Sequence, residues 1–200
     1  MGFLSPFTSV PLLRSKVILR PSTPHDLDQL ITNINSIAAE QIYLQTTTFT
    51  SDAVWDAAIR EGDNPRTGQL VLLPIVNDKA IGYLRIFPGN YGERNRHVGS
   101  IGLGLLPEYR GKGIGSSLMS HALQWAPSAG FEKLEAQIIA TNYPSRRLFA
   151  KFNFVVEGLR RCQLKIRDEL VDELVVALLL RSEASFHCLK SFQNLTLEGV

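Results

Sequence analysis

The segment 104–117 has the residue types and spacing of a phosphate-binding turn. An apolar run that ends at Leu106 is followed by a short polar stretch and then by Arg110-Gly111-Lys112-Gly113-Ile114-Gly115-Ser116, where an amphipathic helical pattern begins. The first N–H groups of a helix have no intrahelical partner, and glycines allow a ligand to approach them closely. The helix dipole also favours an anion at that end. The sequence therefore predicts a cradle for phosphate groups at the start of a helix.

Two common nucleotide-binding motifs do not fit this segment. A Walker-type loop requires a hydroxyl residue after its lysine, but Lys112 is followed by Gly113. A dinucleotide-binding motif requires Gly-x-Gly-x-x-Gly and an acidic residue that ends the next strand, and that strand ends here in Ala140-Thr141-Asn142. Taken alone, the segment is also compatible with a glycine-rich turn that only caps a helix.

A second block of residues, from Asn142 to Phe154, separates these alternatives. Asn142 suits a helix N-cap, Pro144 suits the first turn, and Asn153 suits the left-handed residue that often ends a helix. An Arg-x-x-Gly-x-Gly turn followed at this distance by an Asn-headed helix resembles the GNAT N-acetyltransferases. The resemblance extends over residues 15–181, which is most of the chain.

The resemblance implies a GNAT fold of the α/β (α+β) class, with a central mixed, mostly antiparallel sheet of about seven strands flanked by about four helices. We expect the domain at residues 15–182, between an N-terminal tail (1–14) and a C-terminal tail (183–200). Residue alternation and apolar runs predict strands at 16–20, 69–76, 80–87, 97–106, 134–140, 154–165 and 170–180. Helical spacing predicts helices at 23–40, 51–60, 113–129 and 142–153.

The same resemblance implies acetyl-CoA as co-substrate and no metal ion. The pantetheine arm would pair with main-chain groups at the end of one strand and would receive hydrogen bonds from the head of the last helix, while the turn would hold the pyrophosphate. The residues implied are Gly104, Leu105 and Leu106 for the strand; Arg110, Gly111, Lys112, Gly113, Ile114, Gly115 and Ser116 for the turn; and Asn142 and Ser145 for the helix.

The catalytic residues stay unknown from the sequence. Direct transfer requires a base for the amine and an acid for the departing thiolate. GNAT enzymes similar to the ribosomal-protein alanine acetyltransferases use a Glu and a Tyr for these tasks, but Gln137 and Phe149 occupy those positions here, and neither can titrate usefully.

Four other titratable residues are candidates for catalysis, and each has an ordinary structural alternative. A helix-end or solvent-exposed charge, a surface imidazole or a packed ring would account for them equally simply. The candidates are Glu40, Glu135, His97 and Tyr143.

Composition limits the class of protein. The 200 residues are 44% hydrophobic and 20% charged, carry a net charge of +2 and include two cysteines. These values fit an ordinary globular domain in a reducing cytoplasm and suggest neither a nucleic-acid nor a membrane partner. The expected partner is the acceptor, a small amine or a peptide N-terminus, and a homodimer is compatible with the sequence.

These features together predict an N-acetyltransferase that moves an acetyl group from acetyl-CoA to a primary amine of a small molecule, an amino acid or a protein N-terminus. The alternative is a GNAT-like domain that binds acyl-CoA without catalysis, as a sensor or interaction module. The absence of the Glu/Tyr pair keeps this alternative open.

Overall fold

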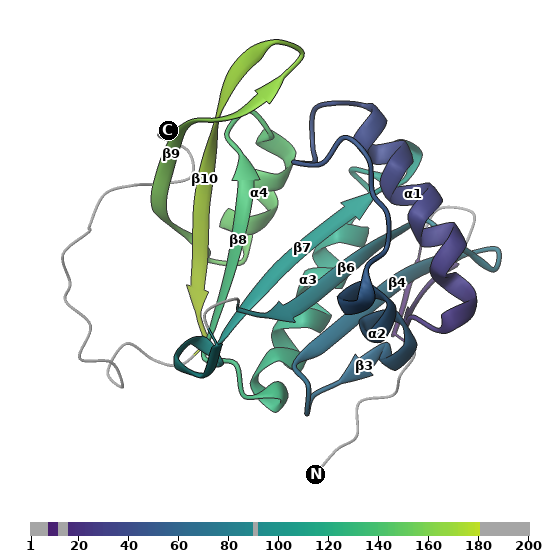
Figure 1. Ribbon diagram of the computed structural model, residues 1–200. Helices are drawn as coiled ribbons and strands as arrows, with labels where there is room; N and C mark the ends of the chain where they lie inside the picture. The colour runs from purple at the N-terminus through teal and green to yellow at the C-terminus, as the bar shows by residue number, and fades with distance from the viewer. Residues whose placement is uncertain (1–7, 12–15, 90–91, 181–200) are drawn as a thin grey trace.

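A ten-stranded sheet organises the part of the chain that this computed structural model describes, residues 8–11, 16–89 and 92–180 (Figure 1). The main path of the sheet is β1-β2-β4-β6-β7-β8-β10-β9, with the short strands β3 and β5 paired to β4. Every pairing is antiparallel except that of β7 with β8. The strands are β1 (Thr8–Pro11), β2 (Lys16–Pro21), β3 (Asp63–Asn64), β4 (Gln69–Val76), β5 (Lys79–Ala80), β6 (Gly82–Pro88), β7 (Val98–Leu105), β8 (Lys133–Ile139), β9 (Val155–Ile166) and β10 (Glu169–Leu179).

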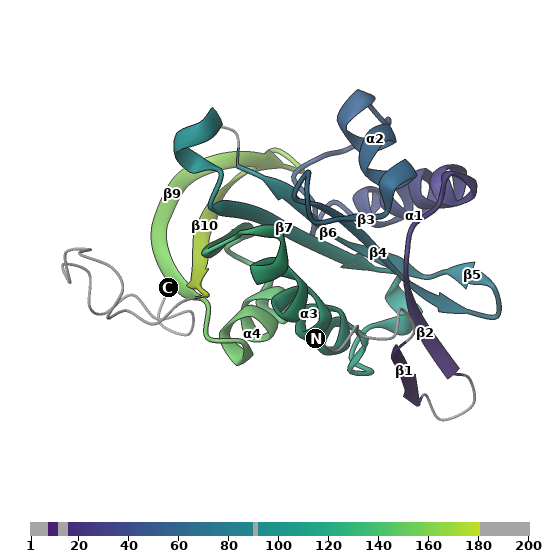
Figure 2. The same cartoon turned by 90° about the horizontal axis from the view of Figure 1, so that it is seen from below.

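Helices cover both faces of the sheet. The helices α1 (Leu27–Ala39) and α2 (Ala53–Glu61) lie on one face, and α3 (Ile114–Trp125) and α4 (Tyr143–Lys151) lie on the other (Figure 2). Alternate residues of a strand point to opposite faces, so Val71 and Leu73 of β4 pack with α1 and α2, while Leu70 and Leu72 join the core that includes α3. Coverage on both sides explains why β4 is an almost continuous apolar run.

The predicted fold class is confirmed, with small differences at element ends. The seven predicted strands and four predicted helices are present, and a 3-10 turn, Pro24–Asp26, begins the first helical segment. The predicted strand 80–87 is divided into β5 and β6. One expectation was wrong: residues 8–11, assigned to the N-terminal tail, form β1 on the edge of β2. Four residues are too few to show a period, and the pairing that fixes them is not visible in the sequence. The predicted C-terminal tail, 183–200, lies outside the described residues.

The strands β7 and β8 separate along their length. They are paired only at Val98–Lys133, Gly99–Leu134 and Ser100–Glu135. Beyond this point β7 continues to Leu105 and β8 to Ile139, each paired with its outer neighbour, β6 or β10 (Figure 1). The sheet is therefore open between them, and the inner edge of β7 can pair with an extended ligand.

Within residues 8–11, 16–89 and 92–180, each helix is too short or too polar to cross a bilayer.

The junction between β2 and α1 depends on a carboxylate that is mostly buried. Asp26 accepts hydrogen bonds from both terminal nitrogens of Arg20, at 2.8 and 2.7 Å, and from the N and Oγ1 of Thr23, both at 2.8 Å. Burial alone would raise the pKa of Asp26, but the bonds from Arg20 and Thr23 outweigh it and hold the pKa below its ordinary value.

We predict that Asp26→Asn lowers the free energy of unfolding at neutral pH by about 2 kcal/mol, because charge-assisted hydrogen bonds and a helix cap are lost. Because the folded-state pKa is depressed, this stabilisation is present above the ordinary carboxyl pKa and is lost as the pH falls below about 4. Denaturant titrations at several pH values measure it. The exposed first-turn residue Asp28, changed to Asn, is the matched control. Equal losses for both variants would contradict the assignment.

Candidate functional site

A cavity of about 580 Å³ lies at the open end of the gap between β7 and β8. Its walls come from β7, the turn before α3, the first turn of α3, one side of α4, and the end of α1 with the segment that follows it. Most of the residues predicted to bind the cofactor line it, namely Gly104, Leu105, Arg110, Gly111, Gly113, Gly115, Ser116, Asn142 and Ser145. The two sequence blocks are therefore brought together around one space.

The N-terminus of α3 is open toward a ligand. Gly113, its N-cap, has φ +83°, and no side chain caps the helix. Gly111 also has a positive φ, and a Cβ at either glycine would meet nothing within 4 Å. By contrast, side chains cap α2 and α4, Asp52 in one and Asn142 in the other. The first N–H groups of α3 are thus left for an outside acceptor, and the turn fits the pyrophosphate of a coenzyme.

Two cations on α4 face the same turn, and sequence reasoning missed both. Arg147 and Lys151 line the cavity, and Lys151 Nζ lies 3.1 Å from Ser116 Oγ. Their spacing of one helical turn on the helix headed by Asn142 was the signal that could have identified them. They place positive charge beside the main-chain cradle, which suits a ligand with several phosphates.

The guanidinium of Arg110 is already occupied by the protein. It donates to both carboxylate oxygens of Glu40, at 2.8 and 2.5 Å, and its Nε donates to the carbonyl of Leu105 at 2.8 Å. Its guanidinium carbon also lies 4.6 Å from the centre of the Tyr43 ring. The bond to Glu40 raises the pKa of Arg110 above its ordinary value. What Arg110 can offer a cofactor is therefore its main chain, while its side chain holds the turn to the end of α1.

The remaining predicted cofactor residues lie differently. Asn142 Oδ1 accepts from the main-chain N of Ser145 at 3.1 Å, which confirms the predicted helix cap. Ile114 is buried in the core and Leu106 packs against the α1 side of the sheet. Lys112 is exposed, with its ammonium 5.7 Å from the Tyr109 ring. The side chains of these last three do not line the cavity.

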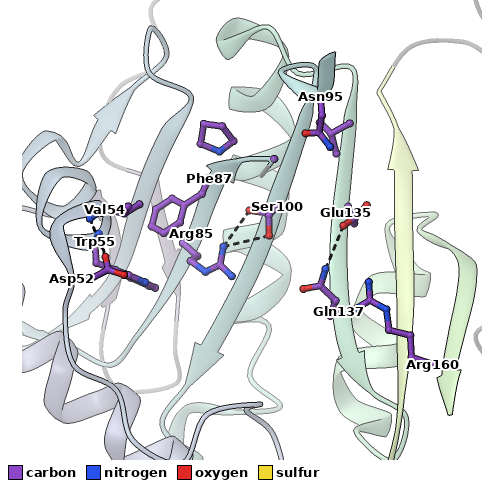
Figure 3. Close-up of a pocket in the computed structure, with 13 residues that line it drawn as sticks. Asp52, Val54, Trp55, Arg85, Phe87, Asn95, Ser100, Glu135, Gln137 and Arg160 are labelled. Atoms are coloured by element: carbon purple, nitrogen blue, oxygen red, sulfur yellow. Dashed lines mark hydrogen bonds between the residues drawn. The ribbon is translucent and has the colours of Figure 1, made fainter. Parts of the chain in front are cut away.

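A second cavity, of about 530 Å³, lies on the α2 side of the sheet, where β7 and β8 are still paired (Figure 3). It shares no lining residue with the first cavity. Its walls combine aromatic, cationic and acidic side chains from α2 and from the strands β6 to β9. They include Asp52, Trp55, Arg85, Phe87, Asn95, Ser100, Glu135, Gln137 and Arg160. The two cavities therefore border the gap at its two ends.

The four catalytic candidates are widely separated. Glu135 lines the α2-side cavity and accepts a hydrogen bond from Gln137 Nε2 at 3.3 Å. Glu40 is ion-paired with Arg110, and His97 is exposed just before β7, at the closed end of the gap. Tyr143 is 57% exposed and lies 5.2 Å from the guanidinium of Arg146. Among these candidates, only Glu135 lies in a described cavity.

Arg85 was missed by sequence reasoning, although a single cation inside the apolar run 81–87 could have indicated it. Its Nη1 lies 3.5 Å from both the carbonyl oxygen and the Oγ of Ser100 (Figure 3). Its guanidinium carbon is 5.0 Å from the Phe87 ring centre and 5.9 Å from that of Trp55. Burial lowers the pKa of Arg85. The neighbouring Arg160, by contrast, is paired with the buried carboxylate of Glu173 at 2.9 Å.

Within the described ranges, no group of three or more His, Cys, Asp or Glu side chains is arranged to hold a metal ion.

Comparisons with known proteins agree with this geometry. The acetyltransferase (GNAT) family matches residues 35–154. The chain is 23% identical to the L-amino acid N-acetyltransferase AaaT of Escherichia coli (strain K12) over 167 residues, which cover 82% of this chain and 98% of that protein. It is 48% identical to YwnH of Bacillus subtilis (strain 168) over 50 residues, but these cover only 25% of this chain and 31% of the relative.

A solved structure of a GNAT superfamily phosphinothricin acetyltransferase from Sinorhizobium meliloti, in complex with acetyl-CoA, has the same fold. The TM-score is 0.72 at 21% identity, and the match covers 82% of this chain and 88% of that one. The match to residues 35–154, together with the open strand pair and the uncapped glycine turn, shows that this chain belongs to the GNAT acetyltransferase family.

Proposed function

We propose that the protein is an N-acetyltransferase that transfers the acetyl group of acetyl-CoA to a primary amine in a ternary complex. The observation that carries the proposal is the gap between β7 and β8, with an anion-binding turn at one end and a separate polar cavity at the other. The name of the AaaT relative and the acetyl-CoA complex of the Sinorhizobium neighbour support the same chemistry.

Acetyl-CoA would lie along the inner edge of β7. The main-chain N–H groups at the start of α3, with Arg147 and Lys151, would hold its phosphates. The pantetheine arm would pair with the main chain of Gly104 and Leu105, next to Asn142 and Ser145. This placement puts the thioester inside the gap and leaves the α2-side cavity for the acceptor.

The transfer is a direct displacement. The nitrogen of a neutral amine attacks the thioester carbon, a C–N bond forms, the C–S bond breaks, and CoA leaves as a thiolate. A main-chain N–H of β7 would stabilise the negative charge that develops on the carbonyl oxygen. The amine loses one proton to a base, and the thiolate takes up one proton, so the products are an N-acetyl amide and CoA.

Glu135 is the base that this geometry favours. It lies on β8 beside the acceptor cavity, in the last β7–β8 pair before the gap opens, and an amide rather than a cation contacts its carboxylate. Glu40 is a weaker candidate, since both of its carboxylate oxygens are engaged by Arg110 and it does not line the α2-side cavity.

The activity is tested by measuring thiol release from acetyl-CoA in the presence of a panel of amines. Thiol release that depends on an amine supports the enzyme. Tight binding of acetyl-CoA without release across the panel would instead support a non-catalytic acyl-CoA sensor. Homodimerisation and a cytoplasmic location stay predictions.

We predict that Gly113→Leu lowers the affinity for CoA by about tenfold or more, because a side chain at φ +83° must distort the turn and its N–H groups. Gly130→Leu is the matched control: Gly130 has φ +81° and equally open surroundings, but it lies at the other end of α3. Both variants carry similar strain. Calorimetric titration with CoA should therefore separate them, and equal affinities would show that the turn is not the phosphate site.

We predict that Glu135→Gln lowers kcat by about 10²-fold or more, because general-base assistance is lost while shape is kept. The affinity for CoA should stay unchanged, since Glu135 is remote from the phosphate turn. The exposed hairpin residue Glu169, changed to Gln, is the control. A Glu135→Gln variant with unaltered kcat over the full pH range would exclude this residue as the base.

A further inference from the structure

Arg85 carries a positive charge that no carboxylate of the described residues neutralises. The ion pairs among the described residues involve other cations, including Arg160, which lines the same cavity as Arg85. Within the described part of the chain, the hydrogen bonds of Arg85 are two long ones, both from Nη1 to Ser100. Arg85 lines the α2-side cavity, and most of its five N–H donors are left without an acceptor from the described residues.

A partly buried guanidinium without an ion-pair partner lowers the stability of the folded state. An unpaired cation that is partly withdrawn from water loses hydration that the protein does not replace. Burial already lowers the pKa of Arg85, which has the same physical origin. The rings of Phe87 and Trp55 recover part of the loss through cation–π contact but supply no acceptor. The site around Arg85 therefore suits an anion that the described residues do not supply.

The shape of the site indicates which anion fits. Arg85 lies opposite Gly102 in the β6–β7 register, and a Cβ on Gly102 would lie 3.5 Å from Arg85 Nε, so no side chain of β7 covers the guanidinium there. The planar guanidinium of Arg85 can donate two parallel hydrogen bonds, and this geometry matches the two oxygens of a carboxylate.

The position of the carboxylate relative to the reacting amine also follows from the sheet. Ser100, which Arg85 reaches, is the direct register partner of Glu135 on β8 (Figure 3). Ser100 and Glu135 lie on neighbouring strands, which are about 4.8 Å apart. An anion that Arg85 binds beside Ser100 and an amine beside Glu135 would therefore be separated by a short link only. The α-carboxylate and α-amine of an amino acid have such a link.

We propose that the acceptor is a small α-amino acid with an apolar side chain, whose carboxylate binds Arg85 while its amine faces Glu135. The apolar side chain would lie against Trp55, Val54 and Phe87, which line the same cavity. This inference rests on the proposed acetyl transfer, but it adds a specificity-determining residue and excludes peptide N-termini, which lack the α-carboxylate.

The experiment compares L-phenylalanine, L-leucine and L-methionine with the amide and the decarboxylated amine of each, in the wild-type protein and in Arg85→Gln. In the wild type, kcat/KM for the amino acids should exceed that for the amides and amines by about 30-fold or more, because those analogues leave Arg85 unpaired. Arg85→Gln should remove this preference by slowing the amino acids alone. The exposed Arg66, changed to Gln, should keep it.

A binding measurement keeps this test independent of catalysis. N-acetyl-L-phenylalanine and N-acetylphenethylamine are titrated into the CoA complex of the wild type and of Arg85→Gln. Tighter binding of the carboxylate product by the wild type, lost in Arg85→Gln, supports the inference even if no amine is turned over. If amines and amides react as well as amino acids, or if neither product binding nor turnover depends on Arg85, the inference is wrong while acetyl transfer itself can still stand.

Thermal unfolding separates recognition from a structural role. Because no carboxylate in the described part of the chain pairs with Arg85, Arg85→Gln should have a melting midpoint equal to or above that of the wild type. A lower midpoint, combined with a uniform fall in kcat/KM for all acceptors, would assign Arg85 to structure and overturn the proposal.

Discussion

The loss of pairing between β7 and β8 is the constraint on which the rest of the structure depends. Main-chain groups inside a sheet normally satisfy one another, and a strand that ends its ladder early leaves polar groups that need a partner. Here the ladder ends at Ser100 and Glu135, although both strands continue. Both cavities border the resulting gap. The outer pairings, β6 with β7 and β8 with β10, keep the two edges apart and in place.

The contact between Arg110 and Glu40 connects the turn to the opposite layer of the molecule. It joins the loop before α3 to the residue that ends α1, across the open end of the gap. Arg167, on the turn between β9 and β10, also donates to the main-chain carbonyl of Glu40 at 2.9 Å. Three segments distant in the sequence therefore meet at one residue, Glu40, and the shape of the first cavity depends on an ion pair as well as on the glycines.

Much of the fold could be predicted because its signals are local. The helix cap at Asn142, the left-handed conformation of Asn153 at φ +61° and that of Gly113 are each determined by one residue type at one place. The features that could not be predicted depend on contacts between residues that are far apart in the sequence. The partner of Arg110 is 70 positions away, and the pairing of β1 requires a partner strand. Arg85 was overlooked because its significance depends on how the strands pack: within the described residues no carboxylate forms an ion pair with it, and a sequence does not show this.

The separation of the two cavities has a consequence for the order of events in turnover. In the arrangement that we propose, a coenzyme in one cavity would leave the other open, and an acceptor would leave the route of the coenzyme open, because the two cavities share no lining residue. Either reactant could then be exchanged while its partner stays bound. In this arrangement, sterics would not impose a fixed order in which the two reactants bind or the two products leave.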